Sequence, residues 1–279
     1  MYLGYNTNGL AHHRFKDAIR LLTELRYRGV AITIDHGVLS PKSNNLSAEI
    51  DQASHVLLQN GLRCVIETGA RFLLDFRKKH HPTLVSATPA DRRCRFEFLK
   101  NAIVVARELS ADCVSFWSGS ADDDASEEQC FGRLVESLKP ILEFATARGV
   151  TLAFEPEPGM FIDTMARFDE LLHRLGPSPL ALTLDVGHLH CQGETPIEEY
   201  IAKYASLIKN IHIEDMRRGV HEHLMFGEGE MNISSIVDAL SKSGYQGGVF
   251  VELSRHSHMG PEAARRAFEY LQPLADWEV

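Results

Sequence analysis

The amino-acid sequence predicts an α/β fold in which eight strands alternate with helices and close into a single (β/α)8 barrel. Short apolar runs alternate with longer amphipathic segments about eight times along the chain. Hydrophobic residues make up 44% of the sequence, which is enough for a large core. Strands separated by helices form a parallel sheet, and eight such units close into a barrel. No linker or low-complexity tract interrupts the pattern, so we expect one domain over residues 1–279.

The first half of the chain contains four of the expected strands. Apolar runs predict strands at residues 3–6, 30–35, 64–67 and 113–117, and apolar residues at helical spacing predict helices at 13–28, 47–60 and 91–109. We expect the first helix to end at Gly29, because glycine favours helix C-termini. Ser47 is expected to cap the second helix, which ends at Gly61. A long polar loop over residues 70–89 follows the third strand.

The second half repeats the same alternation of strand and helix. Strands are predicted at residues 150–154, 180–184, 208–213 and 248–253, and helices at 126–148, 164–175, 196–207, 233–243 and 261–271. The first of these helices is expected to end at Gly149. Pro140 lies inside it, and we expect a kink or a break there because proline removes a backbone donor.

Composition and charge exclude several classes of partner. The formal net charge is -9, which argues against binding to nucleic acids or membrane surfaces, because both are polyanionic. The five cysteines are odd in number and form no CxxC pair, so free thiols in a reducing compartment are expected. The first residues lack the basic flank and apolar run of a signal peptide, and no stretch is apolar enough to span a bilayer. We therefore expect a cytoplasmic protein.

Acidic or imidazole side chains lie at the ends of the four strands of the second half. In a (β/α)8 barrel the reactive residues are found where strands end. Here these are Glu155, Asp185, His212 and Glu252. Each one alone could cap a helix or fill the core. Three converging carboxylates would repel one another without a cation, and together with one neutral imidazole they suit Mn²⁺, Co²⁺, Mg²⁺ or Zn²⁺. Four such residues at one level of the barrel therefore favour a metal site.

Four motifs in the second half resemble those of the xylose-isomerase-like barrels. They are Glu-Pro-Glu-Pro at 155–158, Asp-Val-Gly-His at 185–188, His-Ile-Glu-Asp at 212–215 and Phe-Gly-Glu-Gly-Glu at 226–230. That superfamily includes sugar and sugar-phosphate isomerases and epimerases, hydroxypyruvate isomerase, inosose dehydratase and endonuclease IV. The resemblance covers essentially the whole chain.

The resemblance implies roles for individual residues. The ligands of one divalent metal ion, with Mn²⁺ expected and Co²⁺, Mg²⁺ or Zn²⁺ as alternatives, would be Glu155, Asp185, His212 and Glu252. Glu155 and Glu252 are also implied as the catalytic pair that moves protons on opposite faces of a metal-stabilised enediolate. His188 is implied to contact a substrate oxygen.

Further substrate-binding residues are expected near the same strand ends. His221 and His223 follow the seventh strand and either face the site or lie in a solvated loop. Arg217 or Arg218 is expected to clamp a substrate oxygen, and epimerase relatives suggest Arg218. Trp117 either stacks on a sugar or packs at the rim. Glu157, next to the fifth strand, completes the expected set.

The loop after the third strand contains a basic run. Arg71 and residues 77–81 (Arg-Lys-Lys-His-His) either form a solvated loop or capture a phosphate or carboxylate. The sequence alone is compatible with both.

These patterns predict a metal-dependent isomerase or epimerase of a small sugar, keto-sugar or sugar phosphate, which can form homo-oligomers. The same ligands would also serve a lyase or dehydratase acting on a keto-sugar or cyclitol. An endonuclease IV-like phosphodiesterase is disfavoured, because the extra histidines of that family are missing at residues 67–69 and 116–119, and His221 replaces an aspartate. A catalytically silent binding protein would need a broken acid–base pair, but both Glu155 and Glu252 are present.

Overall fold

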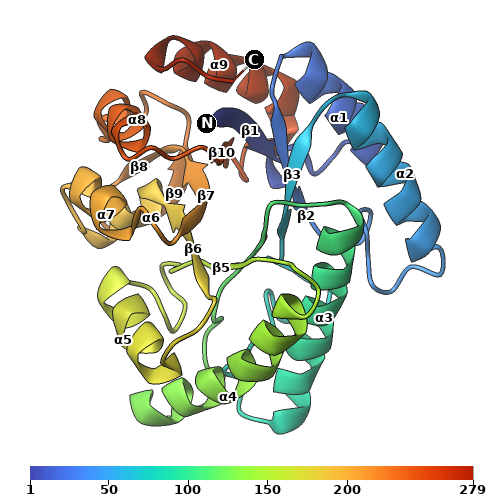
Figure 1. Ribbon diagram of the computed structural model, residues 1–279, viewed down its shortest axis with the longest axis vertical. Coiled ribbons are helices and arrows are strands. Elements are labelled where there is room, and N and C mark those ends of the chain that lie inside the picture. Colours follow the sequence, from blue (N-terminus) through green and yellow to red (C-terminus); the bar gives the residue numbers. More distant parts are fainter. Residues whose placement is uncertain (279) are drawn as a thin grey trace.

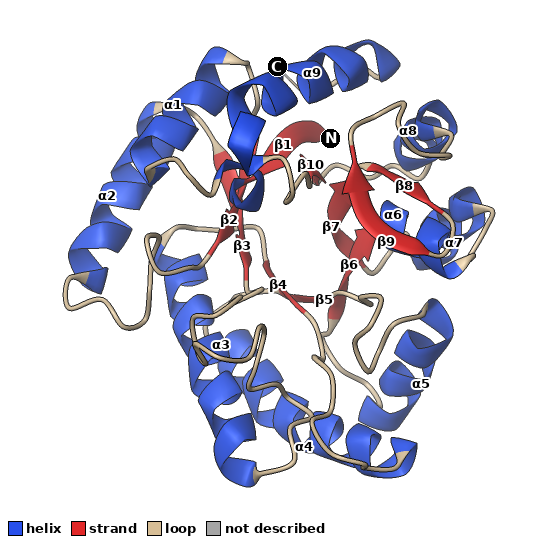
Figure 2. Ribbon diagram, turned by 180° about the vertical axis from the view of Figure 1, so that it is seen from behind, coloured by secondary structure: helices blue, strands red, loops and turns tan. Residues whose placement is uncertain are grey.

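Eight parallel strands form a closed barrel surrounded by helices (Figure 1, Figure 2). The computed structural model describes residues 1–278. The barrel strands are β1 (Tyr2–Asn6), β2 (Gly29–Thr33), β3 (Arg63–Glu67), β4 (Val114–Phe116), β5 (Leu152–Phe154), β6 (Ala181–Asp185), β7 (Ile208–Ile213) and β10 (Gly248–Val251). Their order around the barrel is β1-β10-β7-β6-β5-β4-β3-β2, and each strand is parallel to both neighbours. The predicted (β/α)8 barrel is therefore confirmed.

The helices lie outside the barrel and cover it (Figure 2). They are α1 (Phe15–Glu24), α2 (Leu46–Gln59), α3 (Pro89–Glu108), α4 (Glu127–Thr146), α5 (Met165–Leu175), α6 (Val186–Gln192), α7 (Ile197–Tyr204), α8 (Ile233–Lys242) and α9 (Gly260–Leu271). A separate antiparallel hairpin, β8 (Asp215–Arg217) and β9 (Val220–Leu224), follows β7. The sequence pattern predicted neither this hairpin nor α6. None of the helices in residues 1–278 is both long and apolar enough to cross a membrane.

Several helix ends follow from local hydrogen bonding. Ser126 caps α4, and the side chain of Gln129 returns a bond to the Ser126 backbone, which forms a capping box. The helix continues through Pro140. Of the kink and the break expected at this proline, the break does not occur. Gly149 and Gly61 have φ angles of 68° and 61°, as expected for glycines that follow helices.

Two predicted helix ends are wrong. Gly29 belongs to β2, and α1 ends earlier, with Arg26 at a φ of 68°. A Cβ atom at Gly29 would lie 2.4 Å from the Tyr2 ring, so packing rather than helix termination requires this glycine. Helix α2 begins at Leu46, and its N-cap is Asn45 rather than Ser47.

The interior of the barrel is filled at its amino end. A small apolar cluster there, separate from the main core between strands and helices, includes Tyr2, Ala31, Val65 and Phe250. A Cβ atom at Gly4 would lie 2.3 Å from the Phe250 ring, so only glycine fits at this position of β1. Because apolar side chains fill the amino end, the carboxyl end of the barrel is the end that remains open for a polar site.

Candidate functional site

A cavity of about 320 Å³ opens at the carboxyl end of the barrel. Four glutamates line it, together with imidazoles and a basic edge. The glutamates are Glu67, Glu155, Glu157 and Glu252, and the imidazoles include His212, His221 and His223. The volume suits a small ligand.

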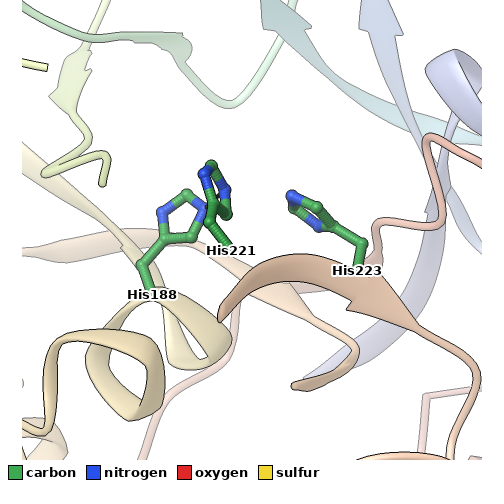
Figure 3. Close-up of side chains that lie close together, drawn as sticks. All are labelled: His188, His221 and His223. Carbon is green, nitrogen blue, oxygen red and sulfur yellow. Dashed lines mark hydrogen bonds between the residues drawn. The ribbon is translucent and has the colours of Figure 1, made fainter. Parts of the chain in front are cut away.

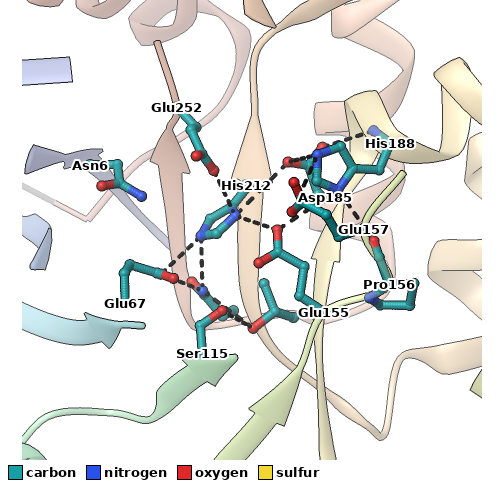
Figure 4. A network of polar contacts seen from close by, with 12 residues as sticks. Asn6, Glu67, Ser115, Glu155, Pro156, Glu157, Asp185, His188, His212 and Glu252 are labelled. Atoms are coloured by element: carbon teal, nitrogen blue, oxygen red, sulfur yellow. Dashed lines mark hydrogen bonds and ion pairs between the residues drawn. The ribbon is translucent and has the colours of Figure 1, made fainter. Parts of the chain in front are cut away.

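The four predicted metal ligands come together in this region (Figure 4). Glu155, Asp185, His212 and Glu252 each offer a donor atom within 4.8 Å of the others. Nδ1 of His212 lies 2.9 Å from Glu155 Oε1 and 3.0 Å from Glu252 Oε2. The residues belong to or follow β5, β6, β7 and β10, which are consecutive in the barrel, so neighbouring strand ends deliver all four side chains.

Asp185 shows how one carboxylate can serve two purposes. Its Oδ1 accepts a hydrogen bond of 2.9 Å from the His188 backbone and thereby caps α6. Its Oδ2 is buried and has no hydrogen-bond partner within residues 1–278. Because an unpaired buried oxygen is costly, Oδ2 fits a role as a ligand for a cation.

Glu67 is a member of this cluster that the sequence pattern did not select as a site residue. It ends β3, which stands across the barrel from β7. Its Oε1 lies 2.9 Å from Nε2 of His212. A carboxylate only accepts, so an Nε2–H donated to Glu67 leaves the Nδ1 lone pair of His212 facing Glu155, Asp185 and Glu252. Metal-binding histidines commonly have such a carboxylate partner.

The electrostatics of the cluster also fit a cation. Burial raises the pKa of Glu155 to about 7. Burial alone would lower the pKa of His212, but Glu155, Glu67 and Glu252 outweigh it and raise that pKa. One imidazolium cannot balance the carboxylates around it, whereas a divalent ion would relieve their repulsion.

Three histidines form a second group beside these residues (Figure 3). His188 comes from α6, and His221 and His223 come from β9. Burial lowers the pKa of His188 to about 4, and its Nδ1–H donates to the Pro156 carbonyl at 3.2 Å. Its Nε2 is therefore an acceptor and lies 3.1 Å from Nε2 of His221. The nitrogens of the three rings lie within 4.8 Å of one another, so they can bind substrate oxygens or an ion.

Most other predicted substrate-binding residues lie at the cavity, but Arg218 does not. Glu157, Trp117, His221 and His223 line the cavity, and His188 lies behind His221. Arg218 occupies the exposed turn between β8 and β9, where its guanidinium packs against Gly193. The hairpin after β7, which the sequence pattern does not predict, places Arg218 at its tip, outside the cavity lining.

Comparisons with known proteins agree with this geometry. A family model described as a xylose isomerase-like TIM barrel matches residues 19–274. Fructoselysine 3-epimerase of Shigella flexneri is 28% identical over 187 residues, which span 66% of this chain and 67% of that protein. Inosose dehydratase of Lacticaseibacillus casei is 28% identical over 155 residues, half of each chain. The structure of 3-keto-D-glucoside 4-epimerase from E. coli has a TM-score of 0.79 at 14% identity, covering 98% of this chain and 99% of that one, and thus shares the fold. Because the family model covers most of the sequence, the chain belongs to the xylose isomerase-like TIM barrel family.

Proposed function

We propose that this protein is a divalent-metal-dependent epimerase or isomerase of a small sugar, keto-sugar or sugar phosphate. The observation that carries the proposal is the convergence of Glu155, Asp185, His212 and Glu252 at the carboxyl end of the barrel, inside or beside a cavity of about 320 Å³. The similarity to fructoselysine 3-epimerase supports the same class of reaction.

The four residues fit one divalent ion, and Mn²⁺ is the expected one because carboxylate oxygens predominate. When bound, such an ion polarises a carbonyl and its neighbouring hydroxyl and acidifies the C–H bond between them. Glu67 holds His212 in the tautomer that can bind the ion. His221 and His223 line the cavity and are proposed to bind substrate hydroxyl groups, and His188 Nε2, 3.1 Å from His221 Nε2, would orient His221.

Glu155 and Glu252 are the proposed acid–base pair. They follow β5 and β10, which flank the two strands that carry Asp185 and His212. In the proposed reaction one carboxylate removes the proton from the carbon beside the carbonyl, and the other returns a proton. Return to the opposite face of that carbon gives an epimer, and return to the neighbouring carbon gives an isomer. Asn8 orients Glu252 through a hydrogen bond of 2.7 Å to Oε1.

The test combines metal content with proton exchange. Metal bound to the purified protein is measured by mass spectrometry, and exchange of C–H protons of D-fructose and D-psicose in D₂O is followed by NMR with added Mn²⁺ or Co²⁺. We expect about one ion per chain, lost in Glu155→Gln and His212→Ala and retained in Glu143→Gln, an exposed glutamate of α4. Protein that binds no metal under any loading condition would refute the proposal.

A dehydration is the second candidate, and the similarity to inosose dehydratase favours it. The first step would be the same removal of a proton, followed by loss of the hydroxyl group on the next carbon as water. The two functions differ in their products. A ketose or inosose that loses 18 mass units points to the dehydratase, whereas exchange of a carbon-bound proton without loss of mass points to the epimerase.

A further inference from the structure

The cavity has a basic edge whose charges the proposed reaction does not use. Arg71, Lys79 and Arg255 line it together with the acidic residues. Arg71 and Lys79 belong to the loop after β3, which rises across the barrel from β7, whereas Arg255 follows β10. The cavity is thus acidic around the four proposed ligands and basic along the loop after β3.

The loop after β3 is held in place by a buried arginine. Arg95 of α3 is only 3% exposed, and it donates to the carbonyls of Thr68 at 3.1 Å, His80 at 2.6 Å and Pro82 at 2.8 Å. The backbone N–H of His80 in turn donates to the Arg71 carbonyl. This bond brings the two ends of residues 71–80 together, so Arg71 and Lys79 are fixed at one edge of the cavity although eight positions separate them.

The charges of Arg71 and Lys79 have no carboxylate partner within residues 1–278. Among the described residues, the Arg71 guanidinium reaches only the Asn8 carbonyl, at 3.5 Å, and none of them forms a salt bridge or side-chain hydrogen bond with Lys79. Arg255 differs, because its Nη1 lies 3.0 Å from Glu222 Oε1. Two cations that line one cavity without counter-ions create a positive potential there, and an anion bound at that edge would be stabilised by it.

We propose that Arg71 and Lys79, assisted by Arg255, form a subsite for an anionic group of the substrate, a phosphate or a carboxylate. The inference rests on the proposed function only for the other end of the substrate, which would react beside Glu155 and Glu252. The chain has a net charge of -9 and the floor of the cavity is acidic, so the basic edge is the favourable place for an anion in this site. The charge distribution therefore also orients the substrate, with its anionic end away from the reacting carbons.

The test compares three ketoses on the metal-loaded protein by calorimetry. D-ribulose 5-phosphate contains a phosphate and D-fructuronate contains a carboxylate, each at the end of the chain remote from the carbonyl, and D-ribulose is neutral. We expect one of the two anions to bind at least about 10-fold more tightly than D-ribulose, because hydrogen bonds to charged groups are strong. The one that does so identifies the anionic group. Equal binding of all three ketoses would overturn the inference.

Charge-removing variants then locate the subsite. Arg71→Gln and Lys79→Gln should each weaken binding of the preferred anion about 5- to 10-fold and leave D-ribulose unchanged. Lys79→Arg should restore binding. The matched control is Lys78→Gln, which removes the same charge one residue away, outside the cavity lining. An equal loss in the control would mean that net charge alone is responsible and would overturn the subsite.

The outcomes also separate this inference from the proposed function. Metal-dependent proton exchange on a neutral ketose, with no preference for anions, refutes the subsite and leaves the proposed function standing. Anion binding that depends on Arg71 and Lys79, with no proton exchange on any ketose, refutes the proposed function and leaves the subsite standing.

Discussion

Removal of the Glu67 carboxylate should weaken metal binding even though Glu67 is not one of the proposed ligands. Glu67 Oε1 lies 2.9 Å from His212 Nε2, and the two residues are 6% and 1% exposed. In Glu67→Ala the imidazole loses the acceptor that fixes its tautomer, and little water is available to replace it. Loss of such partners typically costs 10- to 100-fold in metal affinity. Because both groups are buried, we expect about 100-fold for Glu67→Ala, which corresponds to about 2.7 kcal/mol.

Glu67→Gln provides an intermediate case. Its amide oxygen can still accept from His212 but has no charge, so a loss of about 10-fold in affinity is expected. The dissociation constant for Mn²⁺ is measured by titration followed by electron paramagnetic resonance, and thermal unfolding of the metal-free variants checks the fold. The control is Glu143→Gln, which removes an exposed carboxylate of α4 and should alter affinity by less than about twofold. Wild-type affinity in a folded Glu67→Ala variant would refute the reasoning about the tautomer.

Three further predictions concern stability. Burial lowers the pKa of His80 to about 4 in the folded protein, so the stabilisation from its neutral ring is full above pH 6.5 and is lost as the pH falls towards 4. Over this range the free energy of urea unfolding of wild type should fall by up to about 3 kcal/mol more than that of His80→Gln. Equal losses in the two proteins would contradict the burial argument. Gly4→Ala places a Cβ atom 2.3 Å from the Phe250 ring and should lower the free energy of urea unfolding by about 3 kcal/mol, and adding Phe250→Leu should restore part of it. A single variant as stable as wild type would argue against tight packing at this position. Arg95→Met removes the donor to three loop carbonyls, so we expect faster hydrogen exchange of the backbone amides over residues 69–82. Unchanged protection of these amides would show that other contacts hold the loop.

The barrel could be predicted from the sequence because strand and helix periodicities are strong and alternate regularly. The elements that were missed are short and lack such periodicity. Helix α6 has seven residues and begins directly after β6, and β8 has three. Gly29 was misread because glycine at a helix end and glycine under an aromatic ring have the same signature in a sequence.

The candidate site could be predicted in part, for a related reason. Glu155 and Glu252 could be predicted as site residues because they lie at the ends of strands in the second half of the chain. Glu67 also lies at a strand end, that of β3, but its importance depends on a contact with His212 across the barrel. That contact becomes visible only when the ring of strands is closed. Arg218 was misplaced because a two-residue turn reverses the chain between β8 and β9.

The arrangement of the barrel separates two kinds of evolutionary change. The proposed ion ligands all belong to or follow β5, β6, β7 and β10, whereas Arg71 and Lys79 lie in the segment between β3 and α3. Insertions or substitutions in that segment can alter which molecule is held without moving a ligand of the ion, provided that Arg95 still anchors its ends. New substrates can thus be acquired by changes in this one loop, while the four proposed ion ligands stay on neighbouring strands that the loop does not belong to.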